Sequence, residues 1–263
     1  MRPFHVRVAL LLLVLAAVAG WAWDRLGARR ARTAWDRPVA VAVLVLGEAA
    51  PGSVEMLSGA LDALAGSFAI DMARLRGPGP PPFEFEVVGP LAPERLPPTG
   101  PPEPGPIARV AHALDLWRAA RAAHEAAPGF EPDAYDVRIY LVAQPSGPGG
   151  RLFVEGLGEL GGEVGIVRAS LDWREPLLAA AAVAHEVLHC LGASDKYDDA
   201  GHAIEPAGLA DPDLVPPYPQ RRAEIMVGEV PLAPGRGRLP ESAAEVAVGP
   251  VTAAEIGWVE TGR

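Results

Sequence analysis

Apolar residues follow two patterns along this chain, one continuous and one with helical spacing. Residues 38–47 read Pro-Val-Ala-Val-Ala-Val-Leu-Val-Leu-Gly, an apolar run bounded by residues that interrupt regular structure. Such a run predicts a strand that is buried on both faces. A helix is predicted next, with Ser53 as its cap and its end near Phe68. Its apolar positions at helical spacing are Val54, Leu57, Leu61 and Leu64.

Further segments extend this strand and helix into an α/β sheet. Residues 83–88 alternate as Phe-Glu-Phe-Glu-Val-Val, which predicts a short strand with one solvated face, and residues 135–143 predict a buried strand. Residues 107–127 predict an amphipathic helix that covers the sheet. Its apolar stripe consists of Val110, Leu114, Trp117 and Ala120. Residues 151–154 and 163–169 are expected to pair as a glycine-linked hairpin.

The N-terminal 37 residues differ from the rest. Arg2 and Arg7 precede an uncharged apolar run from Val8 to Trp23, which predicts a signal peptide or a membrane anchor. Five arginines follow within residues 24–37, and the positive-inside tendency favours the cytoplasm for that side. We expect a membrane-anchored or secreted chain whose body, residues 38–263, is extracytoplasmic, because an N-terminal apolar run is typical of export. The cytoplasmic-facing orientation stays open.

Charge and composition narrow the class of partner. The first 37 residues hold seven arginines and two aspartates, which leaves 16 basic and 31 acidic residues in the body. Such an acidic body repels nucleic acid. The 29 prolines and 29 glycines, 12 of the prolines within residues 77–106, indicate long irregular connections. Cys190 is the only cysteine, which excludes an intramolecular disulfide.

The candidate chemistry lies between His185 and Asp195, which reads His-Glu-Val-Leu-His-Cys-Leu-Gly-Ala-Ser-Asp. Two histidines four residues apart on a helix share one face, so His185 and His189 can reach a single ion with Glu186 beside it. Gly192 suits the helix end because it tolerates the left-handed conformation that reverses the chain. The turn would return Asp195 as a third ligand and leave the fourth position of a zinc ion open for water.

This pattern, His-Glu-x-x-His-x-x-Gly-x-x-Asp, resembles the metzincin clan of zinc endopeptidases in its aspartate variant. Snapalysin-like and immune-inhibitor-A-like proteases are similar here, and both tend to carry a tyrosine where this chain has Tyr197. Residues 223–228, with Met226, resemble the Met-turn that lies beneath the metal. The resemblance covers roughly residues 176–228.

The resemblance implies a fold and a reaction. We expect an α/β (α+β) zincin-like domain with a mixed twisted sheet, an active-site helix from Pro176 to Leu191, and a Met-turn. One catalytic Zn²⁺ would be held by His185, His189 and Asp195, with Glu186 as the general base in the hydrolysis of a peptide or protein substrate. In metzincins an edge strand above the cleft binds the substrate, and the hairpin before the helix occupies that place in chain order.

One departure from the family concerns the oxyanion. Many metzincins have a tyrosine shortly after the Met-turn, whereas this chain has no tyrosine after Tyr218. Either Tyr197 or Tyr218 takes that part, or zinc acts without it.

Alternatives remain at the level of sequence. The chain could be a non-proteolytic envelope protein that keeps a zincin fold for binding, or a hydrolase of a non-protein amide. His202 competes with Asp195 as a ligand, and the acidic loop from Asp198 to Glu205 is expected to be solvated and not to hold a second metal. Lys196 is likewise expected to be a solvated loop charge, with an orienting role for Asp195 as the alternative.

Overall fold

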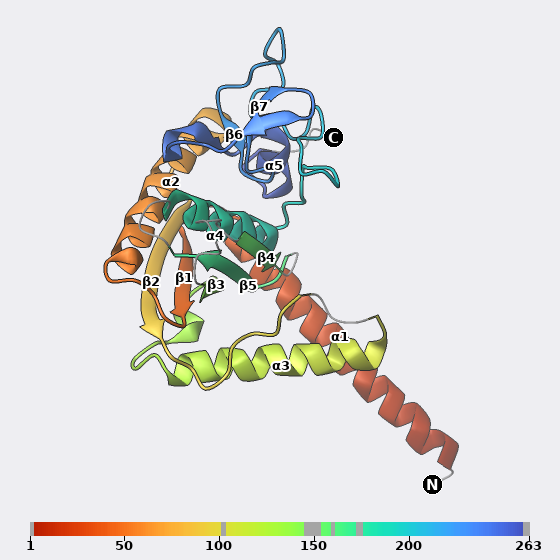
Figure 1. Ribbon diagram of the computed structural model, residues 1–263. Coiled ribbons are helices and arrows are strands. Elements are labelled where there is room, and N and C mark those ends of the chain that lie inside the picture. The colour runs from red at the N-terminus through yellow and green to blue at the C-terminus, as the bar shows by residue number, and fades with distance from the viewer. Residues whose placement is uncertain (1–2, 101–103, 145–153, 159–160, 172–175, 260–263) are drawn as a thin grey trace.

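The computed structural model describes residues 3–100, 104–144, 154–158, 161–171 and 176–259. It shows a mixed α/β architecture around a mostly parallel central sheet (Figure 1). The helices are α1 (Pro3–Arg32), α2 (Ser53–Arg76), α3 (Pro106–Glu125), α4 (Pro176–Leu191) and α5 (Pro250–Glu255). The strands are β1 (Val39–Leu46), β2 (Phe83–Leu91), β3 (Val137–Gln144), β4 (Val154–Gly158), β5 (Val164–Ser170), β6 (Ala223–Glu224), β7 (Val230–Ala233), β8 (Arg236–Arg238) and β9 (Val246–Ala247).

The central sheet has the order β2-β1-β3-β5-β4. Strands β2, β1, β3 and β5 are parallel, and β4 pairs antiparallel with β5 at the edge. The hairpin before α4 is therefore confirmed, but its first strand is Val154–Gly158 and not residues 151–154, of which 151–153 lie outside the described part. The predicted strands near residues 38–47, 83–88 and 135–143 are confirmed as β1, β2 and β3, with small shifts at their ends.

Strand β1 is apolar throughout because both of its faces are covered. Val41, Val43 and Val45 belong to the larger core cluster with α2 and α4, whereas Ala42, Leu44 and Leu46 belong to a second cluster with the C-terminal part of α3. Successive side chains on a strand point to opposite faces, so helices on both sides require an unbroken apolar run.

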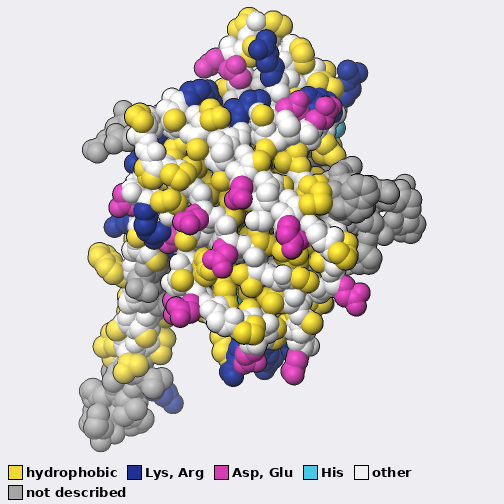
Figure 2. All heavy atoms as spheres, turned by 90° about the vertical axis from the view of Figure 1, so that its left-hand side faces the viewer, with side chains coloured by type: hydrophobic (Ala, Val, Ile, Leu, Met, Phe, Trp, Pro, Cys, Tyr) yellow, Lys and Arg dark blue, Asp and Glu magenta, His cyan; other side chains and the backbone are white. Residues whose placement is uncertain are grey.

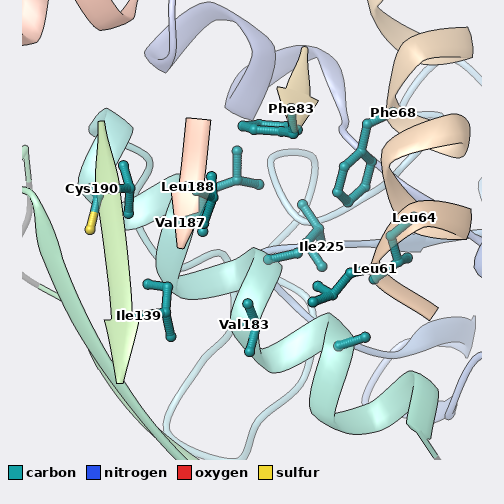
Figure 3. Packing of buried hydrophobic residues seen from close by; sticks show 14 of the residues in the cluster. Leu61, Leu64, Phe68, Phe83, Ile139, Val183, Val187, Leu188, Cys190 and Ile225 are labelled. Carbon is teal, nitrogen blue, oxygen red and sulfur yellow. The ribbon is translucent and has the colours of Figure 1, made fainter. Parts of the chain in front are cut away.

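Helix α4 lies in the larger cluster and packs against α2, β4 and β5. Figure 3 shows Val183, Val187 and Leu188 of α4 among residues of α2 and the sheet. The buried side of α4 fixes its rotation about its own axis, so the face that carries the two histidines is also fixed. Cys190 is buried in this cluster, as expected for a packing residue.

Two predictions about helix α2 are wrong. The helix continues to Arg76 and does not end near Phe68, because Phe68 and Met72 extend the buried face beyond Leu64. Ser53 lies inside the helix, whose cap position is Gly52, and its hydroxyl donates to the carbonyl of Ala50. Among the described residues, α2 is the helix long and apolar enough to cross a membrane; it is part of the core, and α1 adds a shorter apolar stretch, Leu11–Gly20.

The predicted contact face of α3 is also wrong. The residues of this helix that are fully buried are Ala119 and Ala123, whereas Val110, Leu114 and Trp117 are exposed. Only Ala120 of the predicted stripe packs against the core.

The C-terminal end of α1 and the residues after it belong to the body. The side chain of Arg32 is buried and donates to the carbonyl of Gly162 at 3.0 Å and to Glu163 at 3.1 Å. Trp35 is buried edge-on against Phe83 and Trp258, and its indole N–H donates to the carbonyl of Ile256 at 2.8 Å. The core therefore begins before Pro38, although the first strand, β1, begins only at Val39.

We predict that Trp35→Ala lowers the free energy of unfolding by about 3–5 kcal/mol, because it removes a large buried side chain and leaves a cavity. Chemical denaturation of the full chain in detergent measures this loss. Trp23→Ala is the matched control, since Trp23 is exposed on α1. Equal stability of the Trp35 variant and wild type would contradict the placement of this residue in the core.

Candidate metal centre

Three side chains converge at the C-terminal end of α4. One ligand atom from each of His185, His189 and Asp195 lies within 4.8 Å of the others. The Oδ1 atom of Asp195 is 3.1 Å from Nε2 of His185 and 3.2 Å from Nε2 of His189. The two imidazole rings meet edge to face with their centroids 4.7 Å apart. The predicted ligands are thus brought together.

Backbone carbonyls orient both imidazoles. Nδ1 of His185 lies 3.1 Å from the carbonyl oxygen of Ile225, and Nδ1 of His189 lies 2.8 Å from that of Ala193. A carbonyl oxygen can only accept, so the proton is on Nδ1 in each ring and Nε2 is the atom available to a metal. Partners of this kind fix the tautomer and ring direction of histidine ligands.

The turn after α4 returns the chain to the histidines. Gly192 has a φ of 107°, and the amide of Ala193 donates to the carbonyl of Leu188 at 2.9 Å. The predicted left-handed helix end is therefore confirmed. A side chain at this position would also collide with the guanidinium of Arg29, because α1 packs closely against the turn.

Lys196 is buried, and the expectation of a solvated charge is wrong. Its ammonium group donates to Glu255 at 2.7 Å and to the carbonyl of Ser194 at 2.7 Å, while Glu255 also accepts from the amide of Ser194 at 3.0 Å. These bonds hold both neighbours of Asp195, which favours the orienting role.

The segment that contains Met226 lies against both ligand segments. Its Ile225 carbonyl faces His185, and its Met226 carbonyl accepts from the amide of Lys196 at 3.1 Å. The side chain of Met226 is fully buried. The carboxylate of Glu224, also buried, accepts from the Met226 amide at 2.6 Å and the Gly249 amide at 3.2 Å, and so holds the turn from within.

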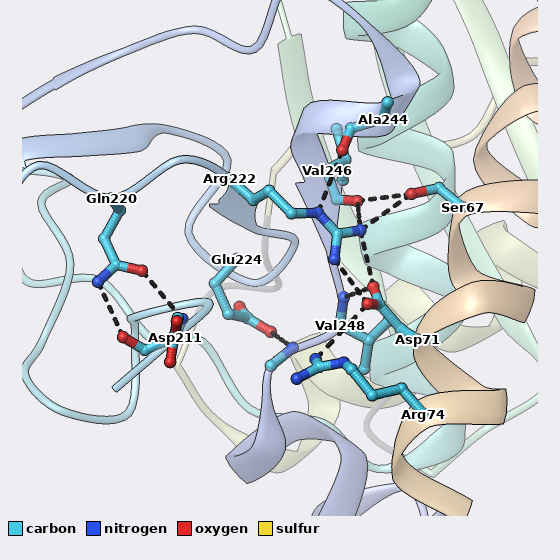
Figure 4. A network of polar contacts seen from close by, with 11 residues as sticks. Ser67, Asp71, Arg74, Asp211, Gln220, Arg222, Glu224, Ala244, Val246 and Val248 are labelled. Carbon is cyan, nitrogen blue, oxygen red and sulfur yellow. Dashed lines mark hydrogen bonds and ion pairs between the residues drawn. The ribbon is translucent and has the colours of Figure 1, made fainter. Parts of the chain in front are cut away.

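A polar network ties this segment to α2 (Figure 4). Arg222 donates to both carboxylate oxygens of Asp71, at 2.6 and 2.9 Å, and to the hydroxyl of Ser67 at 3.0 Å. Asp71 also accepts from the amide of Val248 at 3.1 Å. Because Asp71 is fully buried, its charge requires this bidentate partner. The network fixes the start of the segment that supports His185.

Glu186 is buried beside the ligands, with its Oε2 atom lacking a hydrogen-bond partner among the described residues. It packs on two glycines of the β4/β5 hairpin: a Cβ at Gly156 would overlap its carboxylate, and one at Gly165 would lie 3.2 Å from its Cβ. Burial raises the pKa of Glu186 to about 7, against the opposing charge of His185. A group with a pKa near neutrality is suited to accept and return a proton.

The charges of the ligands are coupled. Burial opposes the protonation of His185, but the hydrogen bond to Asp195 and the charge of Glu186 raise its pKa above the usual value. Burial and the nearby charge of His185 lower the pKa of His189. The hydrogen bond from His185 lowers the pKa of Asp195, which is therefore ionised at neutral pH. An anionic oxygen beside two imidazoles is a donor set that suits a divalent cation such as zinc.

The ligands open onto a cleft of about 1110 Å³. One wall is the edge strand β4 at Gly156, and the opposite side is formed by α2 and by residues 239–243. Tyr197 lines the cleft with its ring against His185, at a centroid distance of 6.4 Å. Burial and the nearby charge of Asp195 raise the pKa of its hydroxyl. The cleft therefore gives a ligand access to both the metal position and Glu186.

Other residues considered from the sequence lie elsewhere. His202 faces Glu229 at 3.1 Å, and Tyr218 is bonded to Glu205 outside the lining of the cleft. Within the described ranges, His185, His189 and Asp195 make up the group of side chains able to hold a metal, and the loop from Asp198 to Glu205 contributes none.

Sequence reasoning missed several supporting residues. Glu224 and Glu255 are remote in sequence from the atoms they hold, and Gly156 lies in a strand whose range was misplaced. The one available signal was the position of Gly156 and Gly165 in the glycine-rich hairpin. No protein-family model matches the chain, and no curated protein matches its sequence.

We predict that His189→Ala abolishes stoichiometric zinc binding, because it removes one of only three convergent ligands. His202→Ala is the matched control and should bind zinc as wild type does. Metal content after dialysis, together with calorimetric titration, measures both. Equal losses in the two variants would contradict the ligand assignment.

We also predict that Lys196→Met weakens zinc affinity by about 10- to 100-fold, the range typical for partners that orient metal ligands. Competition with a fluorescent chelator provides the measurement, and circular dichroism verifies the fold. Arg236→Met, at an exposed position of β8, is the control for loss of a positive charge. Wild-type affinity in Lys196→Met would mean that the lysine does not orient Asp195.

Proposed function

We propose that this chain is a zinc-dependent peptidase with a zincin-like fold. The observation that carries the proposal is the convergence of His185, His189 and Asp195 on an accessible cleft, with Glu186 buried next to them. A structural zinc site is closed by four protein ligands, whereas three ligands on a cleft are typical of a catalytic site. The metzincin resemblance and the Met226 segment support the same reading.

In this proposal the metal and Glu186 have different roles in hydrolysis. A bound Zn²⁺ would act as a Lewis acid toward the attacking water and the scissile carbonyl. Glu186 accepts a proton from the water and passes it to the leaving amine, so the base is regenerated in each cycle. Gly156 and Gly165 leave the space that the Glu186 side chain occupies, and close packing on this backbone limits the motion of its carboxylate.

Two features of the cleft favour an extended peptide as substrate. Strand β4 is at the edge of the sheet, so its outer backbone groups can pair with a peptide backbone. Tyr197 points into the cleft beside His185 and carries a hydroxyl that can donate to a carbonyl oxygen, whereas Tyr218 does not line the cleft. Of the two tyrosines, Tyr197 is therefore our choice for supporting the oxyanion.

The proposed location is a membrane, through α1. Its described apolar side chains from Leu11 to Val18 are exposed, and a helix with such a surface is stable only when lipid or protein covers it. Because α1 continues into the buried Arg32 and Trp35, the anchor and the body are one covalent and packed unit. We place the catalytic body outside the cytoplasm.

A non-proteolytic binding protein is the competing proposal. It would need neither a buried carboxylate without a partner nor an open cleft at the metal position. Hydrolysis of a non-protein amide would use the same residues, and the substrate screen distinguishes it from proteolysis.

We predict that Glu186→Gln retains the fold and zinc but lowers hydrolysis by about 10²- to 10⁴-fold, because the amide cannot accept the proton of the water. Asp195→Asn should instead weaken zinc binding, since a neutral amide is a poorer ligand than a carboxylate. Cleavage of a broad peptide library by the zinc-loaded full chain, with metal content measured in parallel, separates the two effects. Absence of any cleavage by wild type would favour the binding protein.

A further inference from the structure

Helix α3 has two opposite faces. Ala119 and Ala123 are buried, and Ala123 belongs to the cluster that contains Leu44 and Tyr140 of the sheet. Four large apolar side chains point elsewhere, with exposed fractions of 84, 69, 43 and 58% for Ile107, Val110, Leu114 and Trp117. At about 100° per residue these four lie within an arc of roughly 80°, centred almost opposite the buried alanines. We call these four residues the outer face of α3.

Within the described part of the chain, the outer face is largely uncovered, and only its C-terminal end, at Trp117, adjoins Glu94 and Arg95. None of its four residues belongs to either hydrophobic cluster. In Figure 1 the N-terminal half of α3 extends beyond the strands of the sheet. Large apolar side chains that are exposed side by side on one helix face mark a surface that binds a membrane or another protein.

The position of α1 indicates what covers it. In Figure 1, α1 leaves the body and projects from the same end on which α3 lies. In Figure 2, at right angles to that view, the same segment extends below the body, and its described side chains are largely hydrophobic. The exposed apolar residues of α1, such as Leu13 at 70%, therefore lie on a helix that leaves the body at the end of the molecule on which α3 lies.

The chemistry of the outer face suits a lipid interface. Trp117 is an amphipathic ring of the kind enriched at the level of lipid headgroups. Arg121, one turn later, places its guanidinium 6.0 Å from the centre of the Trp117 ring and is exposed. Arg118 lies on the flank of the same face and is also exposed. In the absence of lipid the two arginines form exposed ion pairs, Arg121 with Glu125 at 2.7 Å and Arg118 with Asp115 at 3.2 Å, which are weak and can be exchanged for phosphate. Arginines beside an apolar row can reach headgroup phosphates while the row is buried among acyl chains.

We propose that the outer face of α3 lies in the headgroup region of the bilayer that α1 enters. This inference rests on the proposed membrane location of α1, and it is independent of the peptidase reaction. The two contacts together would restrain the body relative to the membrane, because a single helix alone leaves rotation about its axis free.

Environment-sensitive fluorescence tests this placement in the full chain, reconstituted in phosphatidylcholine vesicles. A cysteine is introduced at Val110 and labelled with a nitrobenzoxadiazole dye. Ile70 on α2 is the matched control, because its exposed fraction is 70% and it lies near the end of α2 remote from α3. A label at Leu13 reports on α1, and unmodified protein, whose Cys190 is buried, is the labelling blank.

The expected result is a blue-shifted emission at Val110 and Leu13, with quenching at Val110 by lipids spin-labelled near the headgroup, quenching at Leu13 by lipids spin-labelled on the acyl chain, and no change at Ile70. Quenching at Leu13 with a water-like, unquenched label at Val110 would overturn the proposal and leave the anchor intact. No quenching at either position would overturn both the anchor and the inference. Zinc content and peptide hydrolysis, measured on the same samples, report separately on the proposed reaction.

Discussion

The site depends on one constraint, which is that a carboxylate beyond the end of α4 must return to two imidazoles on the helix. The left-handed conformation of Gly192 reverses the chain within three residues, and the 3.1 and 3.2 Å distances from Asp195 to the imidazoles follow from that reversal. The carbonyl of Ala193 serves the same turn, since it orients His189. The end of the helix, the carboxylate of Asp195 and the carbonyl that orients His189 are thus parts of a single turn.

Buried charge supports this feature from outside the helix. Lys196 and Glu255 form a pair that fixes the residues on both sides of Asp195, and the carboxylate of Glu224 fixes the Met226 turn. Lys196 and Glu224 are costly to bury, and each is satisfied by several hydrogen bonds with a definite direction. Such bonds provide orientation, which dispersion contacts between aliphatic side chains do not. Glu186 differs, because one of its buried oxygens is left without a hydrogen-bond partner among the described residues.

The cleft and the proposed membrane contacts lie on different sides of the molecule. The candidate metal centre and its cleft lie between α4, α2 and the C-terminal loops, whereas α3 covers the opposite face of the sheet and the N-terminal part of α1 projects from that side (Figure 1). The juxtaposed Arg29, Arg32 and Trp35 connect the two sides, since Arg29 touches Gly192 and Arg32 holds the turn between β4 and β5. An enzyme built in this way would present its cleft away from the bilayer.

Sequence alone determined the local features whose cause is also local. The spacing of His185 and His189 places them on one face of a helix, the glycine at 192 predicts the helix end, and the apolar run of β1 predicts a strand buried on both sides. Tertiary structure decided what depends on distant residues. Periodicity shows that Val110, Leu114 and Trp117 share a face but does not give its direction, and the sheet accepted the alanines of α3 because they permit a closer approach. A lysine in a polar loop is expected to be solvated, yet Lys196 is buried because Glu255, 59 residues later, lies 2.7 Å from it.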